Sequence, residues 1–184
     1  MVVYRAYTNF TAHGRNIQAL MSMYALLESA STAKIPLTTL AVFLAFSVES
    51  YLNAIGGRKI EFWDQIERLS WRSKVEILYS EAKQKPDWGS DPLQFAIEVF
   101  KIRDRLAHGK PERIVGPDMT DEIEAHKYLR ENAMEPDWYT KIDRTWAMAA
   151  KERFRQLMIH LATMHGFHES DHLNLAIGGI ERED

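Results

Sequence analysis

Apolar side chains recur every three to four residues along most of this chain, which is the period of an α-helix. Residues 13–29 show this pattern over a full amphipathic helix. Residues 36–57 are apolar on most faces, so we expect them to form the central helix, ended by Gly56 and Gly57. Further helices are expected over residues 61–69, 71–82, 91–108 and 137–164.

These segments predict an all-α protein, an up-and-down bundle of about five helices in one domain over residues 1–165. Residues 112–136 are polar and fit a long loop, a short helix near 121–131 or a small hairpin. Residues 166–184 begin with a glycine that interrupts the last helix, so we expect them to form a loosely attached C-terminal tail.

The composition is typical of one soluble domain. The chain has 184 residues, of which 46% are hydrophobic and 27% charged, and it contains no cysteine, which is compatible with a reducing compartment. The N-terminus lacks the features of a signal peptide, and the longest apolar run, residues 40–46, is too short to cross a membrane. We therefore expect a cytoplasmic protein with no membrane partner.

Positive charge is concentrated in one stretch. Residues 101–113, KIRDRLAHGKPER, carry a net charge of +3, whereas the whole chain carries −3 and the remainder therefore −6. This local charge attracts phosphate groups, so RNA-binding side chains are expected here. They are Lys101, Arg105, Lys110 and Arg113.

The same stretch holds a histidine close to an acid and an arginine. On a helix, Arg103 and His108 are separated by about 140° around the axis and about 7.5 Å along it, so they do not share a face. Asp104 and His108 are only about 40° apart, so the carboxylate can reach the imidazole and orient it. That carboxylate and the negative end of the helix dipole both favour the protonated ring.

These groups supply what RNA cleavage without a metal ion needs. An imidazole gives or takes a proton, and a guanidinium stabilises charge on a phosphate oxygen. Attack by a 2′-hydroxyl needs a base on one side of the phosphorus and an acid on the other, and a two-fold dimer would supply both histidines. The alternative is an ordinary charged helix end, with the arginine in a surface salt bridge.

Two segments resemble the HEPN family (higher eukaryotes and prokaryotes nucleotide-binding domain), whose members are small helical bundles. Residues 103–110, RDRLAHGK, match the family's motif of an arginine and a histidine separated by four residues near a helix end. Residues 44–57, LAFSVESYLNAIGG, resemble its apolar early helix, with Glu49 and Asn53 in the places of a glutamate and an asparagine. The resemblance covers residues 13–165.

The resemblance implies a homodimer in which the arginine and histidine of two subunits face each other across a cleft. Many members are metal-independent endoribonucleases that leave a 2′,3′-cyclic phosphate and a 5′-hydroxyl, often as toxins or in antiphage defence. By this resemblance His108 is the general acid or base, Arg103 binds the scissile phosphate and Asp104 orients the site, with no cofactor. Glu49 and Asn53 would hold these catalytic side chains in position without taking part in the reaction themselves.

Other members of the family have lost activity and serve as interaction or nucleotide-binding modules. A catalytically inactive module of this kind is therefore the alternative function, and a separately encoded antitoxin or regulatory protein is a further expected partner beside RNA. Some branches place a tyrosine two residues after the histidine, where a partner nucleotidyltransferase modifies it. Lys110 occupies that place here, so this control is not expected.

Glu49 lies among apolar residues of the central helix. A buried carboxylate is costly without a partner, so we expect Glu49 to pair with Arg103 and hold its guanidinium in place. The alternative is that Glu49 points outward into solvent.

Four histidines gather near the end of the chain. A glycine interrupts their helix and no HExxH motif is present, so we expect no metal site. The five tryptophans are expected to anchor the core and the dimer rather than to stack on bases, with Trp88 the most exposed. The four histidines are His160, His165, His168 and His172.

Overall fold

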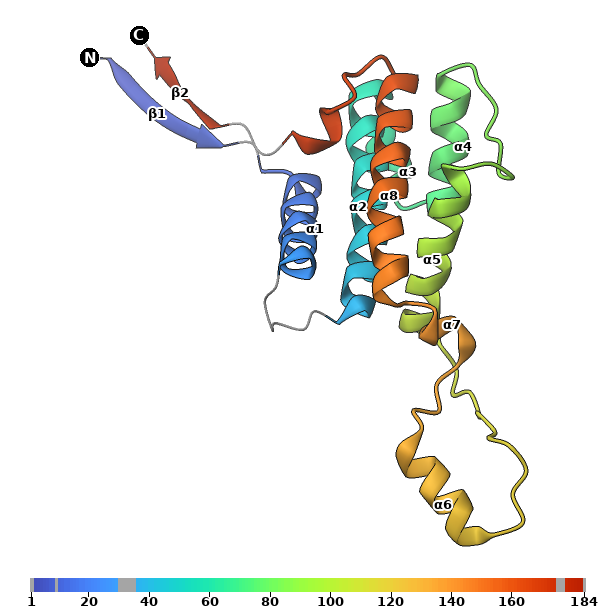
Figure 1. Ribbon diagram of the computed structural model, residues 1–184. Helices are drawn as coiled ribbons and strands as arrows, with labels where there is room; N and C mark the ends of the chain where they lie inside the picture. The colour runs from blue at the N-terminus through green and yellow to red at the C-terminus, as the bar shows by residue number, and fades with distance from the viewer. Residues whose placement is uncertain (1, 9, 30–35, 175–177, 184) are drawn as a thin grey trace.

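The computed structural model describes residues 2–8, 10–29, 36–174 and 178–183. These residues are mostly helical, so the expectation of a broadly all-α protein is confirmed, but the ends of the chain add a small sheet (Figure 1). The elements in chain order are β1 (Val3–Thr8), α1 (Ala12–Glu28), α2 (Leu37–Lys59), α3 (Trp63–Ile66), α4 (Trp71–Glu81), α5 (Leu93–His108), α6 (Glu122–Glu131), α7 (Asp137–Thr140), α8 (Arg144–Met164), the 3-10 turn η1 (Asp171–Leu173) and β2 (Gly178–Glu183).

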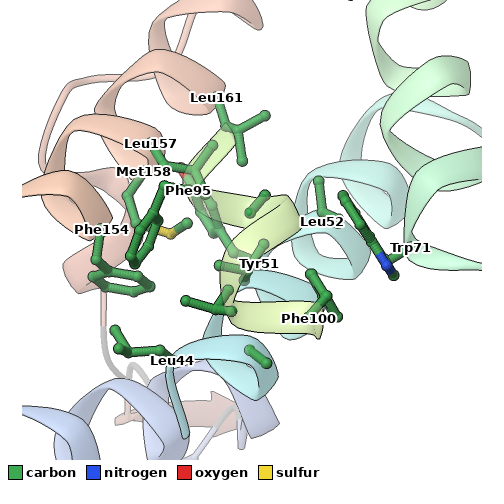
Figure 2. Packing of buried hydrophobic residues seen from close by; sticks show 14 of the residues in the cluster. Leu44, Tyr51, Leu52, Trp71, Phe95, Phe100, Phe154, Leu157, Met158 and Leu161 are labelled. Carbon is green, nitrogen blue, oxygen red and sulfur yellow. The ribbon is translucent and has the colours of Figure 1, made fainter. Parts of the chain in front are cut away.

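Helix α2 is the central helix, as predicted. Helices α1, α4, α5 and α8 pack against it, and Figure 1 shows these long helices side by side. By length and composition α2 could also cross a membrane, but core helices meet the same criterion and its most apolar window is 56% buried here. Figure 2 shows the core side chains of α2, α4, α5 and α8, among them Leu44, Tyr51, Leu52, Trp71, Phe95, Phe100, Phe154, Leu157, Met158 and Leu161.

The predicted end of the central helix is wrong. Helix α2 continues through Gly56 and Gly57 to Lys59. A Cβ atom on Gly56 would lie 2.1 Å from the indole of Trp63, so this glycine allows close packing rather than ending the helix. The helix expected over 61–69 is only the single turn α3.

Side-chain caps fix the starts of α4 and α8. Ser70 was expected to separate two helices, and its Oγ accepts a hydrogen bond from the Ser73 N–H at 3.1 Å at the start of α4. The helix predicted over 137–164 is instead divided into α7 and α8. Asp143 begins α8, because its carboxylate accepts a hydrogen bond from the Trp146 N–H at 2.7 Å.

Residues 114–136, which we call the arm, extend away from the bundle (Figure 1). Of the three alternatives for this region, the short helix is present as α6. Asp121 caps it by accepting a hydrogen bond from the Ile123 N–H at 2.9 Å. No residue of α6 is buried, and the Ile123 and Leu129 side chains are 76% and 60% exposed.

The C-terminal tail is held at two places. Strand β2 pairs antiparallel with β1, with Val3 opposite Glu183 and Thr8 opposite Gly178. In η1, Asp171 and His172 are buried against the bundle. Residues 166–174 are therefore not loosely attached, contrary to the expectation. Residues 175–177 of the predicted tail lie outside the described residues.

Candidate functional site

The last turn of α5 carries His108 past the covered part of the helix, whereas Arg103, one turn earlier, is only partly exposed. From Asp104 to His108 every side chain is exposed, including Leu106 at 37%. A Cβ atom on Gly109 would lie 2.2 Å from the carbonyl oxygen of Arg105, so the glycine lets the chain leave the helix there. The buried residues that fix α5 come earlier and are Leu93, Phe95, Ala96, Val99, Phe100 and Ile102.

Arg103 lies between an acid and an aromatic ring. Its Nε is 3.0 Å from Asp104 Oδ1, and its guanidinium carbon lies 5.0 Å from the centroid of Phe100. The expected pairing of Arg103 with Glu49 is therefore wrong. A guanidinium next to an aromatic face is a common cation–π arrangement, and it supports Arg103 without the glutamate.

Glu49 instead pairs with Lys74 of α4, whose Nζ lies 3.2 Å from Glu49 Oε1. The Lys74 side chain is almost fully buried, so it needs a carboxylate, and the close packing of α4 on α2 supplies one. Lys74 is a residue that sequence reasoning missed, although it lies on the apolar stripe of α4 with Trp71 and Leu78. Asn53 has a buried Oδ1 with no hydrogen-bond partner among the described residues.

The predicted contact between Asp104 and His108 is also absent among the described residues, where Asp104 pairs with Arg103. The contact between Arg103 Nε and Asp104 is an ion pair without a hydrogen bond, and it places the carboxylate beside the guanidinium rather than the imidazole. Asp104 and His108 nevertheless line the same groove, and Arg103 does not.

This groove, which we call the His108 groove, has a volume of about 490 Å³. It lies between the start of α4 and the end of α5 and continues into the residues after Gly109. Four cations line it, and none of them has a carboxylate partner in the described part of the chain. Its two acids are already engaged, Asp104 with Arg103 and Glu112 with the Trp138 indole N–H at 3.0 Å. The four cations are Arg72, Lys101, Arg105 and Lys110.

Three of these four cations belong to the predicted RNA-binding set, and Arg72 was missed. A sequence signal existed, because Arg72 lies in the first turn of α4, where the helix dipole disfavours a cation. Arg113, the remaining predicted residue, lies outside the His108 groove. It lines a neighbouring groove of about 740 Å³ at the base of the arm, which Lys101 and Arg105 also line.

The four C-terminal histidines each have a separate partner. His160 Nε2 lies 2.7 Å from the Tyr79 hydroxyl, and His165 Nδ1 lies 2.9 Å from Glu81 Oε2. Burial lowers the pKa values of His160, His165 and His172 and raises that of Tyr79 to about 12. The described residues contain no group of three or more His, Asp or Glu side chains arranged to hold a metal ion.

Comparisons of the chain with protein-family models, with curated proteins and with solved structures gave no match. The function therefore has to be argued from the site itself.

Proposed function

We propose that the chain is a metal-independent endoribonuclease of the HEPN type, whose active site is completed by a second copy of the chain. The observation that carries this proposal is the His108 groove, where an exposed imidazole lies among four cations that have no carboxylate partner in the described residues. Unpaired cations along a groove bind phosphate groups, and an imidazole beside a bound phosphate can transfer protons.

The reaction would proceed by attack of the RNA's own 2′-hydroxyl. One His108 removes the proton of the 2′-hydroxyl, the 2′-oxygen bonds to phosphorus, and the 5′-oxygen leaves with a proton from His108 of a second copy. The products are a 2′,3′-cyclic phosphate and a 5′-hydroxyl. In this scheme Arg105, which lines the groove with His108, is better placed in one chain to hold the phosphate than Arg103.

A dimer contact at the end of α5 is consistent with the exposed side chains there. Leu106 and Ala107 are exposed in the same turn as His108. Pairing of two such turns about a two-fold axis would cover these apolar residues and bring two copies of Arg103 and His108 within about 10 Å, a distance that one phosphate group can span.

A catalytically inactive RNA-binding module is the second candidate, and a specific observation favours it. Asp104 pairs with Arg103 instead of orienting His108, so two of the three proposed catalytic residues are engaged with each other. Such a module would bind RNA in the same groove without cutting it.

The test is incubation of purified protein with total RNA in the presence of a chelator, followed by analysis of the new ends. We expect wild-type protein to produce 2′,3′-cyclic phosphate ends, His108→Ala to abolish them, and Arg103→Ala or Arg105→Ala to reduce them. His126→Ala, an exposed histidine of α6, is the matched control and should cleave like wild type. Cleavage that survives His108→Ala would assign the activity to another source, and binding without cleavage would identify the inactive module.

A further inference from the structure

An aromatic stack joins α5 to α4 beside the His108 groove. The indole of Trp71 lies parallel to the ring of Phe100, with centroids 4.3 Å apart and an angle of 4° between the planes (Figure 2). Arg103 lies over Phe100, as described above, and the guanidinium carbon of Arg72 lies 5.0 Å from the centroid of Trp71. The motif arginine of α5 and an arginine of α4 thus share one stack.

Arg72 occupies a corner between two indoles. The rings of Trp71 and Trp88 meet at 78°, with centroids 5.8 Å apart, and the Arg72 guanidinium carbon lies 4.9 Å from the Trp88 centroid. Trp88, which was expected to be the most exposed tryptophan, is partly exposed like Trp138 and Trp146 and packs against the core. The two rings restrict the long Arg72 side chain, which has no ion pair with another described residue, so less conformational freedom is lost when Arg72 binds a ligand.

The chemistry of Arg72 differs from that of the two lysines in the groove. Lys101 and Lys110 are point charges that suit phosphate oxygens. A guanidinium is planar, and nucleobases stack on guanidinium planes as they do on aromatic rings. The groove cations can bind the phosphates of a single-stranded nucleic acid, and the planar Arg72 guanidinium can stack on one of its bases, which are free to turn outward. In an A-form duplex the bases are stacked inside the helix, where a side chain at the start of α4 cannot stack on them.

We propose that Arg72, supported by Trp71 and Trp88, stacks on a nucleobase beside the phosphate held near His108, and that the substrate is single-stranded RNA. This inference rests on the proposed function of the His108 groove as an RNA site. It adds the strand state of the substrate and a base-binding residue on α4.

The test measures equilibrium binding to His108→Ala protein, which cannot cut its ligand by the proposed mechanism. Three fluorescein-labelled ligands of equal length are compared: a single-stranded RNA, the same strand in a duplex, and an abasic ribose-phosphate strand of the same charge. Arg72→Lys is then introduced into the His108→Ala protein, because lysine keeps the positive charge and lacks the planar guanidinium group. We expect Arg72→Lys to weaken binding of the single strand about five- to tenfold and to leave the abasic strand unchanged.

Arg68→Lys is the matched control, since Arg68 is exposed and lies outside the groove. It should bind all three ligands like the parent protein. Equal weakening of the single and abasic strands by Arg72→Lys would make Arg72 a phosphate contact and overturn the inference while RNA binding stands. Tighter binding of the duplex than of the single strand would overturn the assigned strand state. Failure to bind any of the three ligands would overturn the proposed function as well.

Discussion

Arg58 of α2 binds Asp171 of η1 through two guanidinium nitrogens, at 2.9 and 2.7 Å. The buried hydroxyl of Tyr51 donates to the same carboxylate at 2.9 Å. The hydrogen bonds from Arg58 hold the pKa of Asp171 below its ordinary value. The Arg58 guanidinium also lies over the ring of Phe167, 3.9 Å from its centroid. One arginine therefore fastens two residues of the tail to the central helix.

Replacing Asp171 by alanine should lower the free energy of unfolding by about 2 kcal/mol, because the Tyr51 hydroxyl loses its acceptor and the bidentate ion pair is lost. Tyr51→Phe keeps the ion pair and should cost about 1 kcal/mol. Urea unfolding followed by circular dichroism measures both values. Arg155→Ala is the control with little effect, since its ion pair with Glu152 is exposed. A stability of Asp171→Ala equal to that of wild type would contradict the fastening of the tail.

His13 of α1 contacts the same part of the tail. Its Nε2–H donates to the main-chain oxygen of His172 at 2.7 Å, and its Nδ1 lies 3.4 Å from the Ser50 hydroxyl. Burial lowers the pKa of His13 and of His172. The nearby charges of Asp171 and Arg58 act on His13 in opposite directions.

The stability of the chain should therefore fall in mild acid. Below the ordinary histidine pKa of 6.5, the unfolded chain binds more protons than the folded chain, whose buried rings stay neutral. Their contribution to stability is complete above about pH 6.5 and decreases as the pH falls below it. Urea unfolding at about pH 8 and about pH 5.5 should show the smaller free energy of unfolding at the lower pH.

His13→Gln should make this decrease smaller, because it removes one of the buried rings. His126→Gln changes an exposed histidine on the arm and should leave the decrease as in wild type. A free energy of unfolding that is larger at the lower of the two pH values than at the higher one would contradict the burial of neutral histidines.

The long helices could be predicted from the sequence because their burial is periodic. Helices α1, α4 and α5 lie within a few residues of the predicted segments, since one face of each packs on α2. The end of α2 could not be predicted in this way, because the rule that glycine ends a helix considers only the backbone. Gly56 lies where Trp63 packs, which is a property of the tertiary structure. The β1–β2 pair joins the two ends of the chain, and no local pattern carries such a contact.

The candidate site shows the same division between local and tertiary information. Helical spacing correctly separates Arg103 from His108, which do not line the same groove. The spacing also brings Asp104 within reach of two partners and does not say that Arg103 is the one it pairs with. The residue opposite Glu49 depends on how α4 sits on α2, so Lys74 could be found only from the packed helices.

Two adjacent glycines of α2 should respond in opposite directions to the same substitution. Gly56→Ala places a methyl group 2.1 Å from the Trp63 ring and should destabilise the chain by about 1–3 kcal/mol through overpacking. Gly57→Ala meets no atom within 4 Å and should stabilise the helix by about 0.5–1 kcal/mol. Thermal unfolding of both variants measures the difference. Similar melting temperatures for the two would contradict the close contact between Gly56 and Trp63.

Glu49→Gln should lower the free energy of unfolding by about 2 kcal/mol, because the Lys74 ammonium then stays buried without a charged partner. The loss is smaller than for a fully buried pair, since the Glu49 side chain is 31% exposed. A double-mutant cycle of Glu49→Gln with Lys74→Met should give a coupling energy of about 1–2 kcal/mol. The matched cycle of Glu49→Gln with Arg103→Gln should give less than about 0.5 kcal/mol, because Arg103 pairs with Asp104. A larger coupling to Arg103 than to Lys74 would restore the pairing expected from the sequence and place Glu49 directly behind the candidate site.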